Sequence, residues 1–327
     1  MRRRMCMAFV GAVILTLAAL PGSAQPSNMA GKVFRLGVLS PDRGFIERLR
    51  IDAIPELARE GFVEGSNLIV DSRAGTPQML AALARELLAA KPDAIIANTS
   101  QAIDAVKSLS DKVPIIGWYI GGDPIAAGFA ISLARPGRNV TGIVMLAPEL
   151  DAKRLDALLE ALPKARRVAT LSDPTRAEPQ YAALRQVGQA HGIELVHFSA
   201  EAPAEFPAVF AAIREADVQA LAILSSPQLL DNASTLAALA LAARLPTVCE
   251  WGVMAKQGCL VGYGPNRAEL QRRAASYVVR IFRGATPSEL PMELPTRFEL
   301  VINLKTARAL GVALPPALLS RADEVIE

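Results

Sequence analysis

The chain has 327 residues and a formal net charge of +3, with 5% aromatic and 20% charged residues. This length is enough for two lobes of roughly 120–150 residues each, and the composition excludes disordered and fibrous proteins. Because no cluster of Lys and Arg with interleaved aromatic residues occurs, the sequence also argues against a nucleic-acid partner.

The first 24 residues are predicted to be a secretory signal peptide that is cut after Ala24. Three arginines, at 2–4, precede an apolar run over 7–20, which is shorter than the ~20 residues that a membrane-spanning helix needs. Small residues then follow, as at signal cleavage sites. An uncleaved anchor is the alternative, and a lipid anchor is not supported because no Cys ends the apolar run. Cleavage would remove three arginines and no acidic residue, lowering the formal charge from +3 to 0, and would place the mature chain in the periplasm.

From residue 33 onward, β-branched apolar runs alternate with apolar patterns of helical period. Up to residue 97 the predicted elements are a strand over 33–39, a helix over 45–60, a strand over 68–71, an amphipathic helix over 77–90 and a strand over 94–97. Pro55 is expected to kink or split the first helix, since proline lacks the N–H that a helix interior uses.

The segment over 113–146 has a βαβ pattern. An apolar strand over 113–116 leads into the turn Gly121-Gly122-Asp123-Pro124, which holds one carboxylate, and a weakly helical piece follows. A second turn over 135–139 precedes a strand over 140–144. Loops after such strands are where α/β proteins bind ligands.

The second half of the chain repeats the alternation. Its predicted strands cover 168–171, 194–198, 220–224, 247–250, 260–264 and 298–303, and its predicted helices cover 179–189, 204–215, 230–243, 267–282 and 304–310. Alternating strands and helices predict parallel sheets that are covered on both faces. The sequence therefore indicates two similar α/β halves.

Six segments, in this order, carry a resemblance to a known family: Gly122-Asp123-Pro124, SLARPGRNVTG over 132–142, Pro148-Glu149-Leu150, Gly262-Tyr263-Gly264-Pro265, PTRFELVINLKTA over 295–307, and RADEVI over 321–326. They resemble the bacterial ABC-transporter substrate-binding proteins whose characterised relatives bind aromatic amino acids. The likeness covers nearly all of the chain from Arg35 to the end.

The resemblance implies the type I periplasmic binding protein fold, in which two Rossmann-like α/β lobes with parallel sheets are joined by a three-crossover hinge. The crossings are expected near 141–146, 260–265 and 293–298. The N-terminal lobe would then comprise 33–142 plus 265–296, and the C-terminal lobe 143–264 plus 297–327. The ligand is expected in the cleft between the lobes.

Catalytic motifs are absent from the sequence. It contains no GxSxG, no P-loop, no GxGxxG and no HExxH. His191 is predicted at a helix end and His197 within a strand, and structural roles are favoured for both because neither has a second metal ligand at short spacing. We therefore expect no enzyme activity, no metal and no cofactor.

Candidate ligand-binding residues follow the predicted strands. They are Ser40, Asn98, Thr99, Ser100 and Asp123 from one lobe, Ser172, Asp173, Thr175, Ser225, Ser226, Glu250 and Trp251 from the other, and Tyr263 on a crossing. Hydroxyls and helix N-termini suit an acid group, a carboxylate suits an ammonium group, and Trp or Tyr suits an aromatic body. The set fits an amino-acid-like solute.

Several assignments keep an alternative. Asn98, Thr99 and Ser100 can cap the next helix as well as contact the ligand. Asp123, the preferred ligand contact, can instead form a turn before Pro124. For Trp118-Tyr119 a core position is favoured over the cleft. Glu250-Trp251 departs from the family's usual sequence, which leaves the ligand's identity open.

The remaining cysteines, Cys249 and Cys259, form either a disulfide or two buried free thiols.

The leading functional hypothesis is a monomeric periplasmic binding protein of an ABC importer. It would bind a small solute, an aromatic or other apolar amino acid by resemblance, and deliver it to a membrane permease. A related carboxylate or a heterocycle is an alternative ligand. A ligand-binding component of a sensory system is the second hypothesis, and a secreted α/β enzyme is the third.

Overall fold

The structure is a computed structural model that describes residues 31–145, 147–174 and 177–327. The predicted signal peptide lies outside these residues. Within them, no helix is both long enough and apolar enough to cross a membrane.

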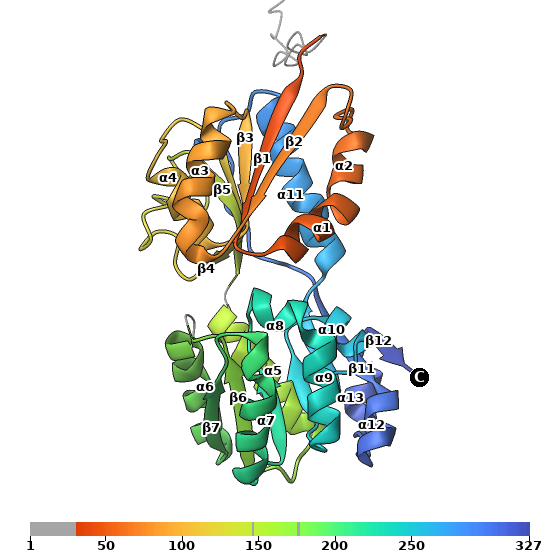
Figure 1. The fold of residues 1–327 in the computed structure, drawn as a ribbon. Helices are drawn as coiled ribbons and strands as arrows, with labels where there is room; N and C mark the ends of the chain where they lie inside the picture. The colour runs from red at the N-terminus through yellow and green to blue at the C-terminus, as the bar shows by residue number, and fades with distance from the viewer. Residues whose placement is uncertain (1–30, 146, 175–176) are drawn as a thin grey trace, which may run out of the picture. The chain divides into compact units, whose positions relative to one another are not determined.

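The first lobe is built on a five-stranded parallel sheet with the order β2-β1-β3-β4-β5 (Figure 1). Its strands are β1 (Phe34–Ser40), β2 (Leu68–Ala74), β3 (Ala94–Ala97), β4 (Ile115–Gly121) and β5 (Val140–Met145). Its helices are α1 (Arg43–Asp52), α2 (Ile54–Arg59), α3 (Leu80–Ala89) and α4 (Ser100–Lys107), with a 3-10 turn at Pro77–Met79.

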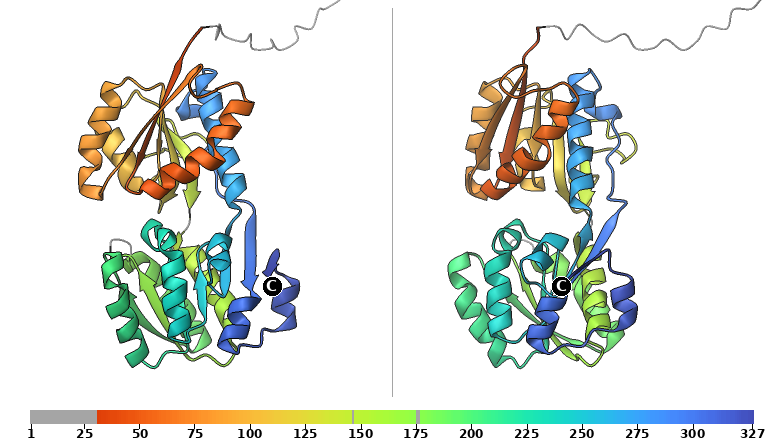
Figure 2. Two further views of the ribbon diagram at one scale, coloured as in Figure 1. Left: turned by 45° about the vertical axis from the view of Figure 1, so that its right-hand side comes forward. Right: turned by 90° about the vertical axis from the view of Figure 1, so that its right-hand side faces the viewer.

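A helix from much later in the chain, α11 (Arg267–Phe282), completes this lobe. It contacts α1 and α2, whereas α3 and α4 contact each other. Figure 2 shows α1, α2 and α11 on one face of the sheet and α3 and α4 on the other. The sheet is thus covered on both faces, which explains why its central strands β3 and β4 are almost fully buried.

The second lobe has a seven-stranded sheet with the order β12-β11-β10-β9-β8-β6-β7. Its strands are β6 (Arg167–Ser172), β7 (Glu194–Ser199), β8 (Ala220–Ile223), β9 (Thr247–Cys249), β10 (Val261–Pro265), β11 (Phe298–Asn303) and β12 (Glu324–Ile326). All neighbours are parallel except β10 and β11, which pair antiparallel. The two α/β lobes confirm the predicted fold class, although this pair departs from a purely parallel sheet.

Helices cover both faces of the second sheet as well. They are α5 (Ala147–Ala161), α6 (Ala177–His191), α7 (Phe206–Glu215), α8 (Pro227–Asp231), α9 (Ala233–Ala242), α10 (Gly252–Lys256), α12 (Leu304–Leu310) and α13 (Pro316–Ser320). Helices α5 and α6 pack together, and α7 packs against α9. A 3-10 turn at Pro203–Glu205 precedes α7, and another at Pro287–Glu289 lies between α11 and β11.

Three connections join the lobes: β5 to α5, β10 to α11, and the segment from Pro287–Glu289 to β11. The first and third run side by side, since Ile143 and Glu293 form an isolated parallel bridge. The lobe limits inferred from the resemblance stay a prediction. In the structure, β5 continues in the first sheet to Met145, three residues past the predicted limit at 142.

The prediction of a weakly helical piece between β4 and β5 is wrong. The chain forms turns over 124–128, where Gly128 has φ +71° and the N–H groups of Phe129 and Ala130 donate to the carbonyl of Pro124. Phe129 is fully buried in the same apolar cluster as residues of α3 and α4. This loop therefore covers the part of the sheet where a crossover helix would otherwise pack.

Other differences from the sequence prediction are smaller. The first helix is split as expected, with Pro55 in the first turn of α2, where a missing N–H costs little. The helix predicted over 230–243 is divided into α8 and α9 at Asn232. Helices α5 and α13 and strand β12 were not predicted.

Cys249 and Cys259 form a disulfide, with their Cα atoms 6.5 Å apart. The bond links the end of β9 to the start of β10 around the short helix α10. Both cysteines are buried, so the bridge fixes the segment that carries Glu250 and Trp251.

Candidate functional site

A cleft between the two lobes is lined by residues from both. The first lobe provides Phe45, Arg48, Asn98, Trp118, Tyr119, Arg267, Leu270 and Gln271, and the second provides Ser226, Pro227, Leu230, Glu250 and Trp251. We call this the inter-lobe cleft. It lies where β3, β4, β8 and β9 end, which is the usual ligand position in open parallel sheets.

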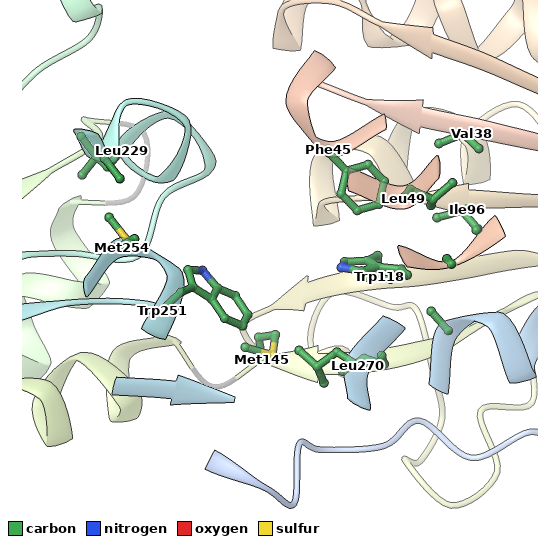
Figure 3. Close-up of a cluster of buried hydrophobic side chains, with 14 of the residues drawn as sticks. Val38, Phe45, Leu49, Ile96, Trp118, Met145, Leu229, Trp251, Met254 and Leu270 are labelled. Atoms are coloured by element: carbon green, nitrogen blue, oxygen red, sulfur yellow. The ribbon is translucent and has the colours of Figure 1, made fainter. Parts of the chain in front are cut away.

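Apolar rings form much of the cleft wall. Trp118 packs edge-on against Phe45 with ring centroids 5.3 Å apart, and Figure 3 shows both rings with Leu270 on the side of the first lobe. Trp251 projects from the second lobe toward Met145 in the same view. Each tryptophan is 8% exposed. Such walls suit a flat apolar group.

Arg48 joins the lobes at the edge of the cleft. Its Nη2 lies 2.8 Å from Oδ2 of Asp42 in the first lobe, and its Nη1 forms an ion pair with Asp231 of α8 in the second. Asp42 also caps α1 by accepting from the backbone N–H groups of Gly44 and Phe45. Burial, together with a hydrogen bond to Asp42, raises the pKa of Asp231 to about 7, although the charge of Arg48 opposes this.

The raised pKa predicts that lobe closure depends on pH. Asp42 faces Asp231 only while the lobes are together, so separation should return Asp231 to its ordinary pKa near 3.9. The closed form therefore binds the extra proton, so this contribution to closure is largest below about pH 4 and is lost progressively as the pH rises to about 7. After allowance for solvent screening we expect a change of about tenfold in the opening equilibrium between pH 5.5 and 8.5.

X-ray scattering of the ligand-free protein at these two pH values measures this shift as a larger radius of gyration at pH 8.5. Asp231→Asn removes the titrating group and should remove the difference. An equal pH dependence in that variant would contradict the assignment to Asp231.

Glu250 and Gln271 line the cleft, and both carry buried acceptor oxygens. Glu250 is 3% exposed and accepts a hydrogen bond of 3.3 Å from the hydroxyl of Tyr119, across the lobes. Gln271 is also 3% exposed, and its Oε1 has no hydrogen-bond partner within the described residues. Buried acceptors without full partners are costly, so these oxygens are candidates for a ligand's donors.

A buried network of charged and polar side chains supports the backbone of the cleft residue Glu250. Arg154 of α5 is 2% exposed, and its Nη1 lies 2.7 Å from both Oδ1 of Asp151 and Oγ of Ser225. Its Nε donates to the carbonyl of Tyr263 at 2.7 Å, and its Nη2 donates to that of Glu250 at 3.3 Å. Burial raises the pKa of Asp151 to about 6, against the attraction of Arg154. Arg154 thus holds the backbone from which Glu250 and Trp251 project.

Four of the predicted site residues line the cleft: Asn98, Ser226, Glu250 and Trp251. Trp118 and Tyr119, for which a core position was favoured, line it too. Trp118 belongs both to the buried apolar core and to the lining of the cleft.

The other predicted residues of the first lobe are not among the residues that line the cleft. Ser40 accepts from Asn98 at 3.1 Å and so positions that side chain. Thr99 caps α4 by accepting from the N–H of Ala102, and Ser100 bonds the backbone of Gly121. Asp123 is exposed, and its Oδ1 accepts from the N–H of Ile125 at 2.8 Å in a turn. Their contact with a ligand stays a prediction that this geometry does not favour.

In the second lobe, Ser172 is fully buried against His197, and Ser225 is held by Arg154. Asp173 lies in a neighbouring groove with Asp42 and Asp231. Tyr263 lies in a separate groove, stacked on Phe298. Thr175 lies outside the described residues. For these residues of the second lobe, too, contact with a ligand stays a prediction.

Sequence reasoning missed the cleft residues that come from helices: Phe45, Arg48, Pro227, Leu230, Arg267, Leu270 and Gln271. It considered only loops that follow strands. One available signal was that α11 begins directly after the predicted second crossing, so that its first turns had to lie beside the hinge.

Comparison with known proteins agrees with this architecture. The profile of the ABC transporter substrate binding protein family matches residues 51–326. A tyrosine-binding protein from Clostridioides difficile (strain R20291) is 21% identical over 276 residues, which cover 82% of this chain and 77% of that protein.

Two solved structures share the fold, each with a TM-score of 0.80 and each covering 90% of this chain and 100% of its own. One is a conserved domain protein from Vibrio cholerae, at 24% identity, and the other is an ABC domain in complex with L-Trp from Streptococcus pneumonia, at 20% identity. Because the family profile also spans most of the sequence, this chain belongs to the ABC transporter substrate binding protein family.

Proposed function

We propose that this protein is the soluble binding component of an ABC importer. It binds one small amino-acid-like solute with an aromatic or other apolar body in the inter-lobe cleft, and it delivers the solute to a membrane permease. It works in the periplasm as a monomer, without a covalent step. The solute acts by binding the closed form better than the open form, which shifts the equilibrium between them.

The cleft itself is the observation that carries this proposal. Two tryptophans and a phenylalanine supply apolar walls, and a few buried polar groups from both lobes converge on the same space. This combination is typical of small-molecule sites. Relatives whose names refer to tyrosine and L-Trp support an amino-acid-like solute with a ring.

A thermal-shift screen of the chain from Gln25 tests the proposal. The panel comprises amino acids, aromatic acids and small heterocycles, and a true ligand at a hundred times its dissociation constant should stabilise the protein by about 2.7 kcal/mol. Trp251→Ala should abolish the shift because it removes a cleft wall. Asp123→Ala should keep it because Asp123 lies outside the cleft.

Ligand-dependent closure provides the second measurement. Each hit should lower the radius of gyration of the wild type in X-ray scattering. Hits that stabilise wild type and Trp251→Ala equally, with no change in the radius, would contradict binding in the inter-lobe cleft.

A further inference from the structure

The charges around the inter-lobe cleft are unequally compensated. Arg48 is paired with Asp42 and Asp231, and Arg267 lies 3.0 Å from Asp52. Glu250, in contrast, takes part in none of the ion pairs formed within the described part of the chain. Among the residues that the structure describes, the two cationic side chains of the cleft therefore have carboxylate partners, whereas the carboxylate of Glu250 has no cationic partner.

Burial makes this imbalance costly. Glu250 is 3% exposed, and within the described residues its carboxylate accepts a hydrogen bond from the hydroxyl of Tyr119 alone. Arg154 lies behind it but bonds only its backbone carbonyl, while the charge of Arg154 is directed at Asp151. A buried carboxylate gains most from a partner that is both charged and a hydrogen-bond donor.

Gln271, which also lines the cleft, carries a second acceptor. Oε1 of Gln271 is buried and unpartnered among the residues that the structure describes. Leu270, its neighbour on α11, and Trp251, the neighbour of Glu250, point into the space between the lobes from opposite sides (Figure 3). The cleft thus offers acceptors from both lobes and aromatic faces that attract cations.

We propose that the cleft selects its solute through a protonated nitrogen held by Glu250 and Gln271, and that the solute needs no carboxylate. This inference rests on the proposed function and narrows its ligand class to organic amines with a flat apolar body. Amino acids are accepted as members of that class, through their ammonium group. A solute carboxylate would have to compete with Asp52 or Asp42 for an arginine.

Three matched sets of probes test the proposal on the wild-type protein by isothermal titration calorimetry. They are tyramine and tryptamine, which carry only the ammonium group; 4-hydroxyphenylpropionate and indole-3-propionate, which carry only the carboxylate; and L-tyrosine and L-tryptophan, which carry both. We expect the amines to bind, and the acids to bind about 10–100-fold more weakly than the matching amines.

Substitutions at Glu250 and Gln271 test whether these two acceptors cause the preference for amines. Glu250→Gln keeps the shape but removes the charge, and it should weaken amine binding about 10–100-fold. Gln271→Met removes only the amide and should weaken it about threefold or more. Glu215→Gln is the matched control, because Glu215 is exposed at the end of α7 in the same lobe as Glu250, and it should bind amines as the wild type does.

The outcomes separate this inference from the proposed function. Binding of the acids in place of the amines would overturn the inference and leave a solute-binding protein. Equal amine affinity in the wild type and both acceptor variants would overturn it too, as would amine probes that fail to bind while any neutral or anionic solute does. Failure of every solute class to bind or close the cleft would instead remove the proposed function as well.

Discussion

Replacing Arg154 by methionine is expected to lower the free energy of unfolding by about 3–5 kcal/mol, because it leaves a buried carboxylate without its cation. Asp151 would keep only hydrogen bonds from Gln180 and Ser225. The carbonyl groups of Tyr263 and Glu250 would also each lose a donor. Urea unfolding followed by circular dichroism measures this loss.

The pH dependence of the stability loss in Arg154→Met distinguishes an effect of charge from an effect of lost packing. Asp151 already has a pKa of about 6 in the folded protein, and loss of Arg154 should raise this pKa further. The folded state of Arg154→Met would then bind more protons than the unfolded state above pH 4, so its stability should fall as the pH rises. The deficit relative to the wild type should be larger at pH 8 than at pH 5.

The double variant Arg154→Met/Asp151→Asn is the control, since it leaves no unpaired charge and should recover part of the stability. A double variant as unstable as the sum of the two single variants would show that the two residues act independently. A loss below about 0.5 kcal/mol in Arg154→Met, the size of an ordinary surface change, would contradict the structural role assigned to this network.

Substituting alanine for Gly142 is expected to be still more damaging. A Cβ on Gly142 would lie 2.0 Å from the carbonyl oxygen of Gly117, and the backbone of Gly142 has φ +138°. The clash is with the backbone of the paired strand β4, so no side-chain movement can relieve it. We expect a loss of about 4 kcal/mol or more, the range of severe steric changes, seen as little folded protein or a steep fall in the urea midpoint.

Gly61→Ala is the control that separates the effect of the steric clash in Gly142→Ala from the effect of backbone strain. Gly61 has φ +92°, but nothing lies within 4 Å of a Cβ at this position, so alanine should cost only about 1–2 kcal/mol. Equal losses in the two variants would show that the backbone conformation dominates. The position of Gly142 matters for function because β5 leads directly into the first connection between the lobes.

Local pattern was enough to locate several elements of this protein. The ranges predicted for α11, β11 and α12 agree with the structure residue by residue, because helical periodicity, a β-branched run and a helix-ending glycine are each encoded within a few residues. Gly311 illustrates this point, since it ends α12 with φ +70°. The alternation of such elements also sufficed for the fold class.

The loop between β4 and β5 could not be read from its own sequence. Its turns form because Phe129 fits among the side chains of α3 and α4, and that gap exists only once the sheet is assembled. The role of Ser225 was missed for a similar reason, since it follows a strand but bonds to Arg154. The turn that Asp123 forms was one of the two alternatives that the sequence left open.

The amino-acid sequence by itself determined the two α/β halves, the positions of most strands and helices, and four of the residues that line the cleft. Only the tertiary structure decided that α11 packs on the first sheet, that helices supply more than half of the cleft wall, and that Arg48 joins the two lobes. The physical reason is that periodicity and turn chemistry act over a few residues. Burial and charge compensation, in contrast, depend on groups such as Arg48 and Asp231, which are 183 residues apart in the chain.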